Sequence, residues 1–195
     1  MRAFLAVPSE PGWVESTRQL SSRLREALPR ASWTPAESWH LTLKFFEDIS
    51  REQSGHFGDA VAPVAVATVA GEIQASGAVA FPPRGPARVL GVGFEPSETL
   101  ARIRRLAQEA ELQARRLGLP EERREFHPHV TLARLRGPWP PESIEVFRRE
   151  VERWKFPPWR VVRCTLFQSR LTPEGAVHTK LAEWPFDGTT SEARA

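Results

Sequence analysis

The same four-residue pattern, His-x-Thr-Leu, occurs twice in this chain, at His40 to Leu43 and at His129 to Leu132. The two histidines are 89 positions apart. If each pattern lies on a β-strand, its His and its Thr point to one side of that strand, because successive side chains alternate. Two such strands side by side would bring two imidazoles and two hydroxyls together.

Two neighbouring imidazoles can carry out acid-base chemistry near neutral pH. One histidine can accept a proton while the other donates one. Such a pair suits displacement at phosphorus, where a nucleophile loses a proton and a leaving oxygen gains one. The hydroxyls of Thr42 and Thr131 would hydrogen-bond the non-bridging oxygens as negative charge builds on them. We therefore predict that His40, His129, Thr42 and Thr131 are catalytic.

Each copy of the pattern follows the same order of expected elements. Apolar residues 4–7 predict a buried strand, and the capped helix that follows ends at Pro29. Apolar residues 88–94 predict a second strand, followed by a helix that starts near Ser97 and ends at Gly118. The order strand, helix, loop, pattern therefore occurs twice, which predicts two lobes related by approximate twofold symmetry.

The remaining segments complete the expected secondary structure. A capping box at Ser50 to Gln53 opens a helix that we expect to end near Val61. The other expected elements are a strand over 64–80, a loop over 81–86, a short helix around 144–151, a strand over 159–171, a type I turn at 172–175 and a returning strand over 176–184. We expect one bilobal domain over 1–186 and a tail without fixed structure over 187–195.

The composition is that of an ordinary globular protein, with 41% hydrophobic and 26% charged residues. The net charge is +3, and arginines far outnumber lysines. This arginine content is compatible with phosphate partners, although it can equally reflect the base composition of the genome. Cys164 is the only cysteine, which excludes an intramolecular disulfide and a cysteine-based zinc site. Lacking a signal peptide or an apolar run long enough to span a membrane, the chain is expected to be a cytoplasmic protein. We also expect it to be a monomer without a membrane partner.

The doubled pattern and its surroundings resemble the two-histidine (2H) phosphoesterase superfamily, specifically the LigT-like RNA 2',3'-cyclic phosphodiesterases, long called 2'-5' RNA ligases. The resemblance covers almost the whole chain. It rests on residues 2–7, 39–45, 126–134 and 169–171, the last just before the turn at Gly175 and Ala176. It implies a mixed α/β (α+β) fold of two lobes, each with a mainly antiparallel sheet and flanking helices, and an active-site cleft between them.

The resemblance also implies an activity and a division of roles. The activity is metal-independent and cofactor-independent opening of a 2',3'-cyclic phosphate, at an RNA end or on a small cyclic nucleotide, to a 2'-phosphate. His40 would be the acid that protonates the leaving O3', and His129 the base that activates water. The chain departs from many relatives at His178, where they have Tyr, and at residues 90–92, where they have Trp. Both departures put the nucleotide preference in doubt.

Two basic residues near the patterns are candidates for binding phosphate. Lys44 lies four positions after His40, on the same face if the strand stays extended; the alternative is a solvated strand end. Arg134 lies five positions after His129, nominally on the opposite face, although a β-bulge could redirect it.

Aromatic and loop residues supply the other candidates for substrate binding. Phenylalanine rings can stack on the bases of single-stranded RNA, and the core is the alternative place for each of them. Phe81 could likewise stack on a base or belong to the core. The predicted binding residues are Phe45, Phe126, His178 on the last hairpin, and Arg123 and Arg124 in the loop before the second pattern.

Alternative functions remain open at this point. The same acid and base could act on 2'-5' linkages or other cyclic nucleotides, or join RNA ends in the reverse direction. A different class is a non-catalytic module that binds RNA ends. A metal site at His127 and His129 is disfavoured, because Pro128 separates them and no carboxylate lies at a comparable spacing.

Overall fold

The described parts of the molecule, residues 1–28, 31–172 and 175–187 of a computed structural model, contain ten β-strands, four α-helices and one short 3-10 helix, η1 (Ala36–Ser38). The strands are β1 (Arg2–Pro8), β2 (Ser32–Trp33), β3 (His40–Phe46), β4 (Gly71–Ile73), β5 (Ala75–Phe81), β6 (Val89–Phe94), β7 (His129–Arg134), β8 (Trp159–Val161), β9 (Arg163–Thr172) and β10 (Gly175–Pro185). The helices are α1 (Pro11–Ala27), α2 (Arg51–Val66), α3 (Glu98–Arg116) and α4 (Pro141–Arg153).

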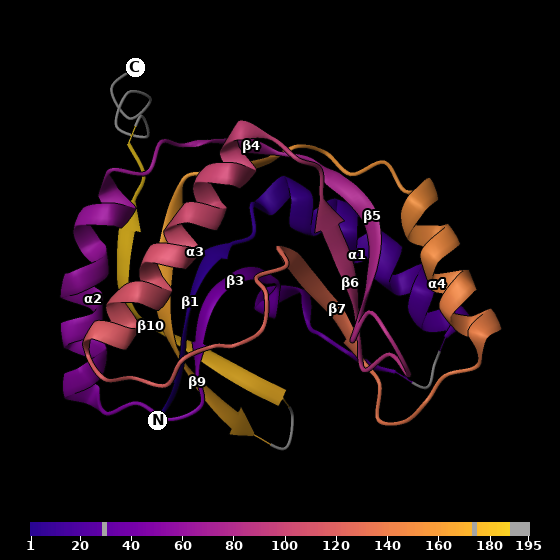
Figure 1. Cartoon of the computed structure of the whole chain (residues 1–195). Coiled ribbons are helices and arrows are strands. Elements are labelled where there is room, and N and C mark those ends of the chain that lie inside the picture. The colour runs from indigo at the N-terminus through magenta and orange to yellow at the C-terminus, as the bar shows by residue number, and fades with distance from the viewer. Residues whose placement is uncertain (29–30, 173–174, 188–195) are drawn as a thin grey trace.

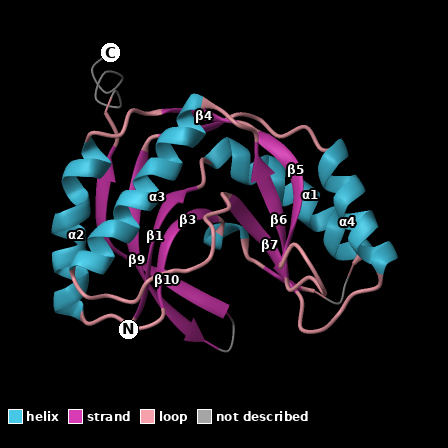
Figure 2. Ribbon diagram, viewed as in Figure 1, coloured by secondary structure: helices cyan, strands magenta, loops and turns pink. Residues whose placement is uncertain are grey.

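The strands of the main sheet fall into two groups, one in each lobe of the molecule, and the groups meet where β3 pairs with β7. Its strand order is β10-β9-β1-β3-β7-β6-β5, with β2 paired to β7, and all of its pairings are antiparallel. We call β10, β9, β1 and β3 the first lobe, and β7, β6, β5 and β2 the second lobe (Figure 2). A separate two-stranded sheet pairs β4 with β8. The mixed, two-lobed fold expected from the sequence is therefore confirmed.

The helix of each repeat crosses to the opposite lobe. α1 follows β1 of the first lobe but packs against α4, which contacts β5 of the second lobe. α3 follows β6 of the second lobe but packs against β3 and α2 of the first lobe. Figure 1 shows α2 and α3 on one side of the molecule and α1 and α4 on the other. The lobes thus exchange helices.

Local sequence signals explain where the helices begin and end. The Glu10 side chain accepts hydrogen bonds from the backbone N–H groups at the start of α1, and the Ser97 hydroxyl does the same at α3. Ser50 and Gln53 form the expected reciprocal capping box at α2. Gly118 takes a positive φ of 70° just after α3, a conformation that favours glycine. The helix starts predicted from the sequence are therefore confirmed.

Two expected boundaries differ from the structure. α2 continues to Val66 because Pro63 is tolerated there: residue 59, whose carbonyl loses its helical hydrogen bond, is exposed to solvent. The expected strand over 64–80 is instead the end of α2, a turn, β4 and β5. Three expected features lie outside the described residues: the helix end at Pro29, the tip of the turn at 172–175, and the tail over 188–195. Asp187, which was expected to begin that tail, is described: its N–H donates to the carbonyl oxygen of Thr68, and its carbonyl oxygen accepts from the N–H of Ala70. No helix in the described ranges is long and apolar enough to cross a lipid bilayer.

Candidate active site

The pairing of β3 with β7 brings the two His-x-Thr-Leu patterns together. Leu41 pairs with Val130, and each lies between the His and the Thr of its own pattern. Because the strands are antiparallel, this register sets His40 beside Thr131 and Thr42 beside His129. Leu41 and Val130 are fully buried in the core, whereas all four His and Thr side chains are partly exposed on the opposite face. We call this face of the two strands the site face.

Both imidazoles are held by the same backbone contact. Nδ1 of His40 lies 2.7 Å from the carbonyl oxygen of Ser38, and Nδ1 of His129 lies 2.7 Å from that of His127. A carbonyl oxygen can only accept, so each Nδ1 carries the proton and donates it. The Nε2 atom of each neutral ring is then left as a proton acceptor. The sequence contains no signal for these contacts, which depend on the backbone two residues upstream.

A β-bulge follows the Thr in both copies. Thr42 pairs with Ala6 but Lys44 pairs with Leu5, so Leu43 has no partner on β1. In the second lobe Thr131 pairs with Gly91 but Ala133 pairs with Leu90, so Leu132 is the bulged residue. Each bulge reverses the alternation of side chains beyond it. Residues five positions after each His, Phe45 and Arg134, therefore return to the site face.

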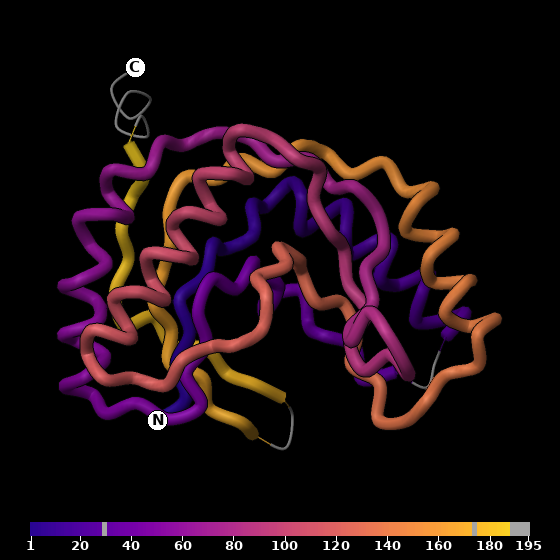
Figure 3. Tube along the Cα trace, viewed as in Figure 1, coloured from indigo at the N-terminus to yellow at the C-terminus, as the bar shows by residue number. Residues whose placement is uncertain are grey.

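The expected position of Lys44 is wrong for this reason. The bulge turns Lys44 away from the site face, and its side chain is only 2% exposed. Its Nζ donates to Glu111 Oε2 of α3 at 2.6 Å and to the carbonyl oxygen of Pro120 at 3.0 Å. Glu111 also accepts from the backbone N–H of Glu122. Lys44 thus anchors the segment between α3 and β7, whose path is followed in Figure 3, rather than a substrate phosphate.

Aromatic rings surround His40. The ring of Phe4 stacks on its imidazole, with centroids 4.4 Å apart, and the ring of His178 meets it edge-on at 5.5 Å. Phe167 stacks on the far side of Phe4. Burial, with positive charge on His178 as a second cause, lowers the pKa of His40 to about 4. His178, predicted as a binding residue, therefore lies in direct contact with His40.

The surroundings of His129 are more open. On the neighbouring strand β6, Gly93 pairs with His129 and Gly91 pairs with Thr131, so β6 places no side chain beside either residue. A Cβ at Gly91 would lie 2.3 Å from the carbonyl oxygen of Val130, which explains the need for glycine beside the bulge. The ring of Phe81 contacts His129 at 4.7 Å.

The positive charge of Arg134 affects the pKa of both imidazoles. Burial is the largest cause of the lowered pKa of His129, and the positive charge of Arg134 lowers it further. The same guanidinium also lowers the pKa of His40. Arg134 is therefore close enough to act on both rings, in a position where it could bind an anion held between them.

The remaining predicted binding residues lie in the segment before β7. Arg124 donates to the carboxylate of Glu122, and this hydrogen bond lowers the pKa of Glu122 to about 2, so the charge of Arg124 is locally neutralised. Arg123 is exposed. Phe126 is partly buried and packs against the hydrophobic core. The structure thus groups Phe45, Arg134 and His178 with the four His and Thr residues, although the Phe45 ring also contacts the guanidinium of Arg2. Phe126 packs on the core, and Arg124 pairs with Glu122.

The chain belongs to the LigT-like phosphoesterase family, whose model matches residues 8–91 and 93–178. It is 28% identical over 181 residues to an RNA 2',3'-cyclic phosphodiesterase of Methanothermobacter thermautotrophicus, covering 93% of this chain and 96% of the relative. It is 31% identical over 147 residues to a protein of the same name from Aeropyrum pernix, covering 75% and 81%.

Solved structures show the same fold. A Thermus thermophilus protein matches with a TM-score of 0.75 and 24% identity, over 95% of this chain and 97% of that chain. E. coli LigT complexed with 3'-AMP matches with a TM-score of 0.71 and 22% identity, over 95% and 98%.

Proposed function

We propose that this protein opens 2',3'-cyclic phosphates at RNA ends to 2'-phosphates, with His40 and His129 as the proton-transfer pair and no metal ion. The observation that carries the proposal is the pair of Nδ1-anchored imidazoles on one face of adjacent antiparallel strands. Each ring offers its Nε2 atom, and a threonine hydroxyl follows each His on that face. The relatives named RNA 2',3'-cyclic phosphodiesterase support the same substrate.

The reaction needs one proton removed and one supplied. His129 takes a proton from water through Nε2 as the water oxygen bonds to phosphorus. The bond between phosphorus and O3' breaks, and the proton on His40 passes to O3'. The phosphate remains on O2', and the two histidines exchange their protonation states. A second proton transfer between the rings or through solvent restores the starting state.

The lowered pKa values give the free protein one of the two protonation states that this assignment needs, and the bound substrate supplies the other. Because both pKa values lie below the ordinary value of 6.5, both rings are mostly neutral at pH 7 in the free protein. A neutral His129 is in the state that a base requires. His40 needs a proton, and the negative charge of a bound cyclic phosphate raises the pKa of a neighbouring imidazole. The substrate anion thus favours the protonation that the acid requires.

The other groups on the site face bind the substrate. The hydroxyls of Thr42 and Thr131 donate to the non-bridging oxygens, and the Arg134 guanidinium offsets the charge that develops there. Phe45 and His178 present rings on the side of His40, where they can contact the terminal nucleoside.

The direct test is hydrolysis of 2',3'-cyclic AMP in the presence of EDTA, with the products separated by chromatography. We expect 2'-AMP, formed at the same rate with and without the chelator. Formation of 3'-AMP would contradict the proposed leaving group, and loss of activity in EDTA would contradict the metal-independent mechanism. If neither cyclic nucleotides nor oligonucleotides with cyclic ends are hydrolysed, the protein is a binding module.

A further inference from the structure

The site face continues into a hollow on the side of His129. The hollow has a volume of about 340 Å³ and lies against β5, β6, α3 and the residues just before His129. Its size falls in the range of roughly 300 to 1,000 Å³ that is usual for small-molecule sites. The ring of Phe81 stands at the junction, 4.7 Å from the ring of His129 and 5.7 Å from that of His127. Phe81 thus separates the imidazole pair from the hollow.

Glycine keeps this hollow open. Gly93 pairs with His129 and lines the hollow, and a Cβ there would lie 2.9 Å from Val79 Cγ1 and 3.2 Å from Ser76 Oγ. On the other side of the site, Phe4 and His178 pack directly on His40. Space for a second group beyond the terminal nucleotide is therefore present next to His129.

The lining combines rings with a positive charge. Phe81 and Phe94 provide apolar faces, and His127 provides an exposed ring. Arg104 of α3 also lines the hollow, and its guanidinium donates a hydrogen bond to the carbonyl oxygen of Phe126. None of the residues that line the hollow, all of them described, is acidic; the nearby exposed carboxylate of Glu125 lies 3.7 Å from Nε2 of His127. Aromatic faces beside a cation are the features by which proteins bind single-stranded nucleic acid without reading its sequence.

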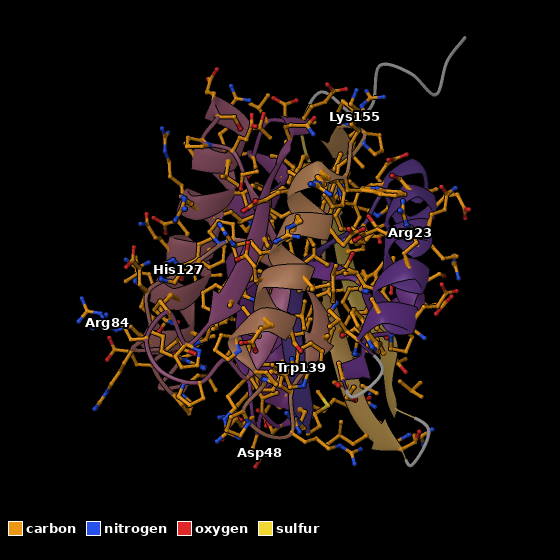
Figure 4. All side chains as sticks on the ribbon, turned by 90° about the vertical axis from the view of Figure 1, so that its right-hand side faces the viewer. Arg23, Asp48, Arg84, His127, Trp139 and Lys155 are labelled. Carbon is orange, nitrogen blue, oxygen red and sulfur yellow. The ribbon has the colours of Figure 1, made fainter. Side chains whose placement is uncertain are left out.

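Further positive charge lies along the same edge of the molecule. Figure 4 shows the side chains of Arg84 and His127 projecting from this edge. Arg84 belongs to the loop that follows Phe81, and it is exposed to solvent. The edge therefore offers an anionic strand a path away from the hollow.

We propose that this hollow binds the second nucleotide from the 3' end of the RNA, with its base against Phe81 and His127 and its phosphate near Arg104. The inference rests on the proposed function, because it requires the terminal cyclic phosphate to lie between His40 and His129. A terminal nucleotide with a cyclic phosphate is joined to the rest of the RNA only through its O5'. O5' belongs to the same ribose as the cyclic phosphate, so the preceding nucleotide begins one sugar away from the imidazole pair. The hollow lies within that reach, because Phe81, which lines it, contacts the ring of His129.

The proposal predicts a preference for substrates longer than one nucleotide. We expect wild-type protein to hydrolyse ApA ending in a 2',3'-cyclic phosphate with a KM about tenfold below that for 2',3'-cyclic AMP, since stacking of one base contributes about this much. Arg104→Ala removes the cation, and Ser76→Ile fills the hollow from its exposed rim with a residue suited to a strand. Both variants should lose the dinucleotide preference and keep the wild-type kcat and KM for 2',3'-cyclic AMP.

The matched control is Arg105→Ala, which removes an equal charge from the next exposed position of α3. It should retain the preference, and thermal melting should show all variants folded. Equal KM values for the two substrates in wild-type protein would overturn the proposal while leaving the hydrolytic function intact. An equal loss on both substrates in Arg104→Ala would assign the hollow to the terminal nucleotide instead. Failure of wild-type protein to hydrolyse either substrate would overturn the proposed function itself, and this inference with it.

Discussion

The two lobes place the same four-residue pattern in different surroundings. Both His rings donate through Nδ1 to the carbonyl two residues upstream, and both Leu residues are bulged. Around His40, the neighbouring strand β1 supplies the ring of Phe4, and β10 at the edge of the sheet supplies that of His178. Around His129, the neighbouring strand supplies two glycines, and a hollow opens beyond Phe81.

This difference shows which features come from the repeated backbone and which from its neighbours. The shared strand, bulge and carbonyl contact fix the tautomer and direction of both imidazoles. The residues around them set the pKa of each ring and the space beside it. A symmetric backbone can thus hold two chemically different histidines, as an acid-base pair requires.

The largest effect is expected from removing either imidazole. His40→Ala and His129→Ala should each lower kcat for 2',3'-cyclic AMP by about 1,000-fold, because each removes one of the two proton transfers. His56→Ala is the control, since His56 is exposed on α2. Steady-state kinetics provide the measurement. Near-normal kcat in either site variant would show that the lobes do not share the chemistry.

Arg134 and Phe45 occupy equivalent positions after the two bulges, but only Arg134 carries charge. Arg134→Met should raise the KM for 2',3'-cyclic AMP by about tenfold or more, through loss of a charge-assisted contact to phosphate. Phe45→Leu should have a smaller effect. The control for net charge is Arg136→Met, at an exposed position two residues further on. An equal response to Arg136→Met and Arg134→Met would show that the charge acts only at long range.

The bulge in the first lobe gives Lys44 a structural role, which a substitution at Lys44 can test. Lys44→Met should lower the free energy of unfolding by about 2 kcal/mol, because it removes the donor to Glu111 Oε2 and to the carbonyl oxygen of Pro120. Urea denaturation measures this change. Lys180→Met, at an exposed surface pair with Glu183, should change stability by less than about 1 kcal/mol. A folded, fully stable Lys44→Met variant with a raised KM would instead place Lys44 at the substrate.

The smallest effect is a shift in titration. Positive charge on His178 lowers the pKa of His40, so His178→Phe should raise it. The value should stay below 6.5, because burial is the larger cause and a phenyl ring preserves it. NMR titration of the His40 ring measures the change. In the control His127→Phe, His129 should respond instead of His40, since His127 lowers the pKa of His129; an unchanged His40 in His178→Phe would contradict the assigned contact.

The meeting of the two His-x-Thr-Leu patterns on one face could be predicted from the sequence, because the signal in each copy is local. Alternation along a strand placed His40 and Thr42 on one face, and the repeated order of elements predicted that the two patterns would meet. The bulge at Leu43 has no such signal, since Leu43 and Lys44 fit an extended strand equally well. The corresponding bulge at Leu132 in the second lobe places Arg134 on the site face. In that lobe Gly91 was a usable signal, because glycine inside a strand often marks a bulge or a close backbone approach.

Features that depend on distant segments were not predictable in this way. Phe4 and His178 reach His40 from β1 and β10, and the latter is near the other end of the chain. The exchange of helices between lobes leaves no mark on local periodicity, because an amphipathic helix does not specify which apolar face it will cover.

The exchange of α1 and α3 makes the two halves of the chain dependent on each other. A fragment ending before β6 would keep β3 but lose α3, which covers it and pairs with Lys44. A fragment beginning at β6 would keep α4 but lose α1. Each fragment would therefore lack a helix that packs against elements it retains. Most stabilising contacts form only after distant segments meet, so folding pays a large loop-closure entropy first and is expected to be slow and cooperative over both lobes.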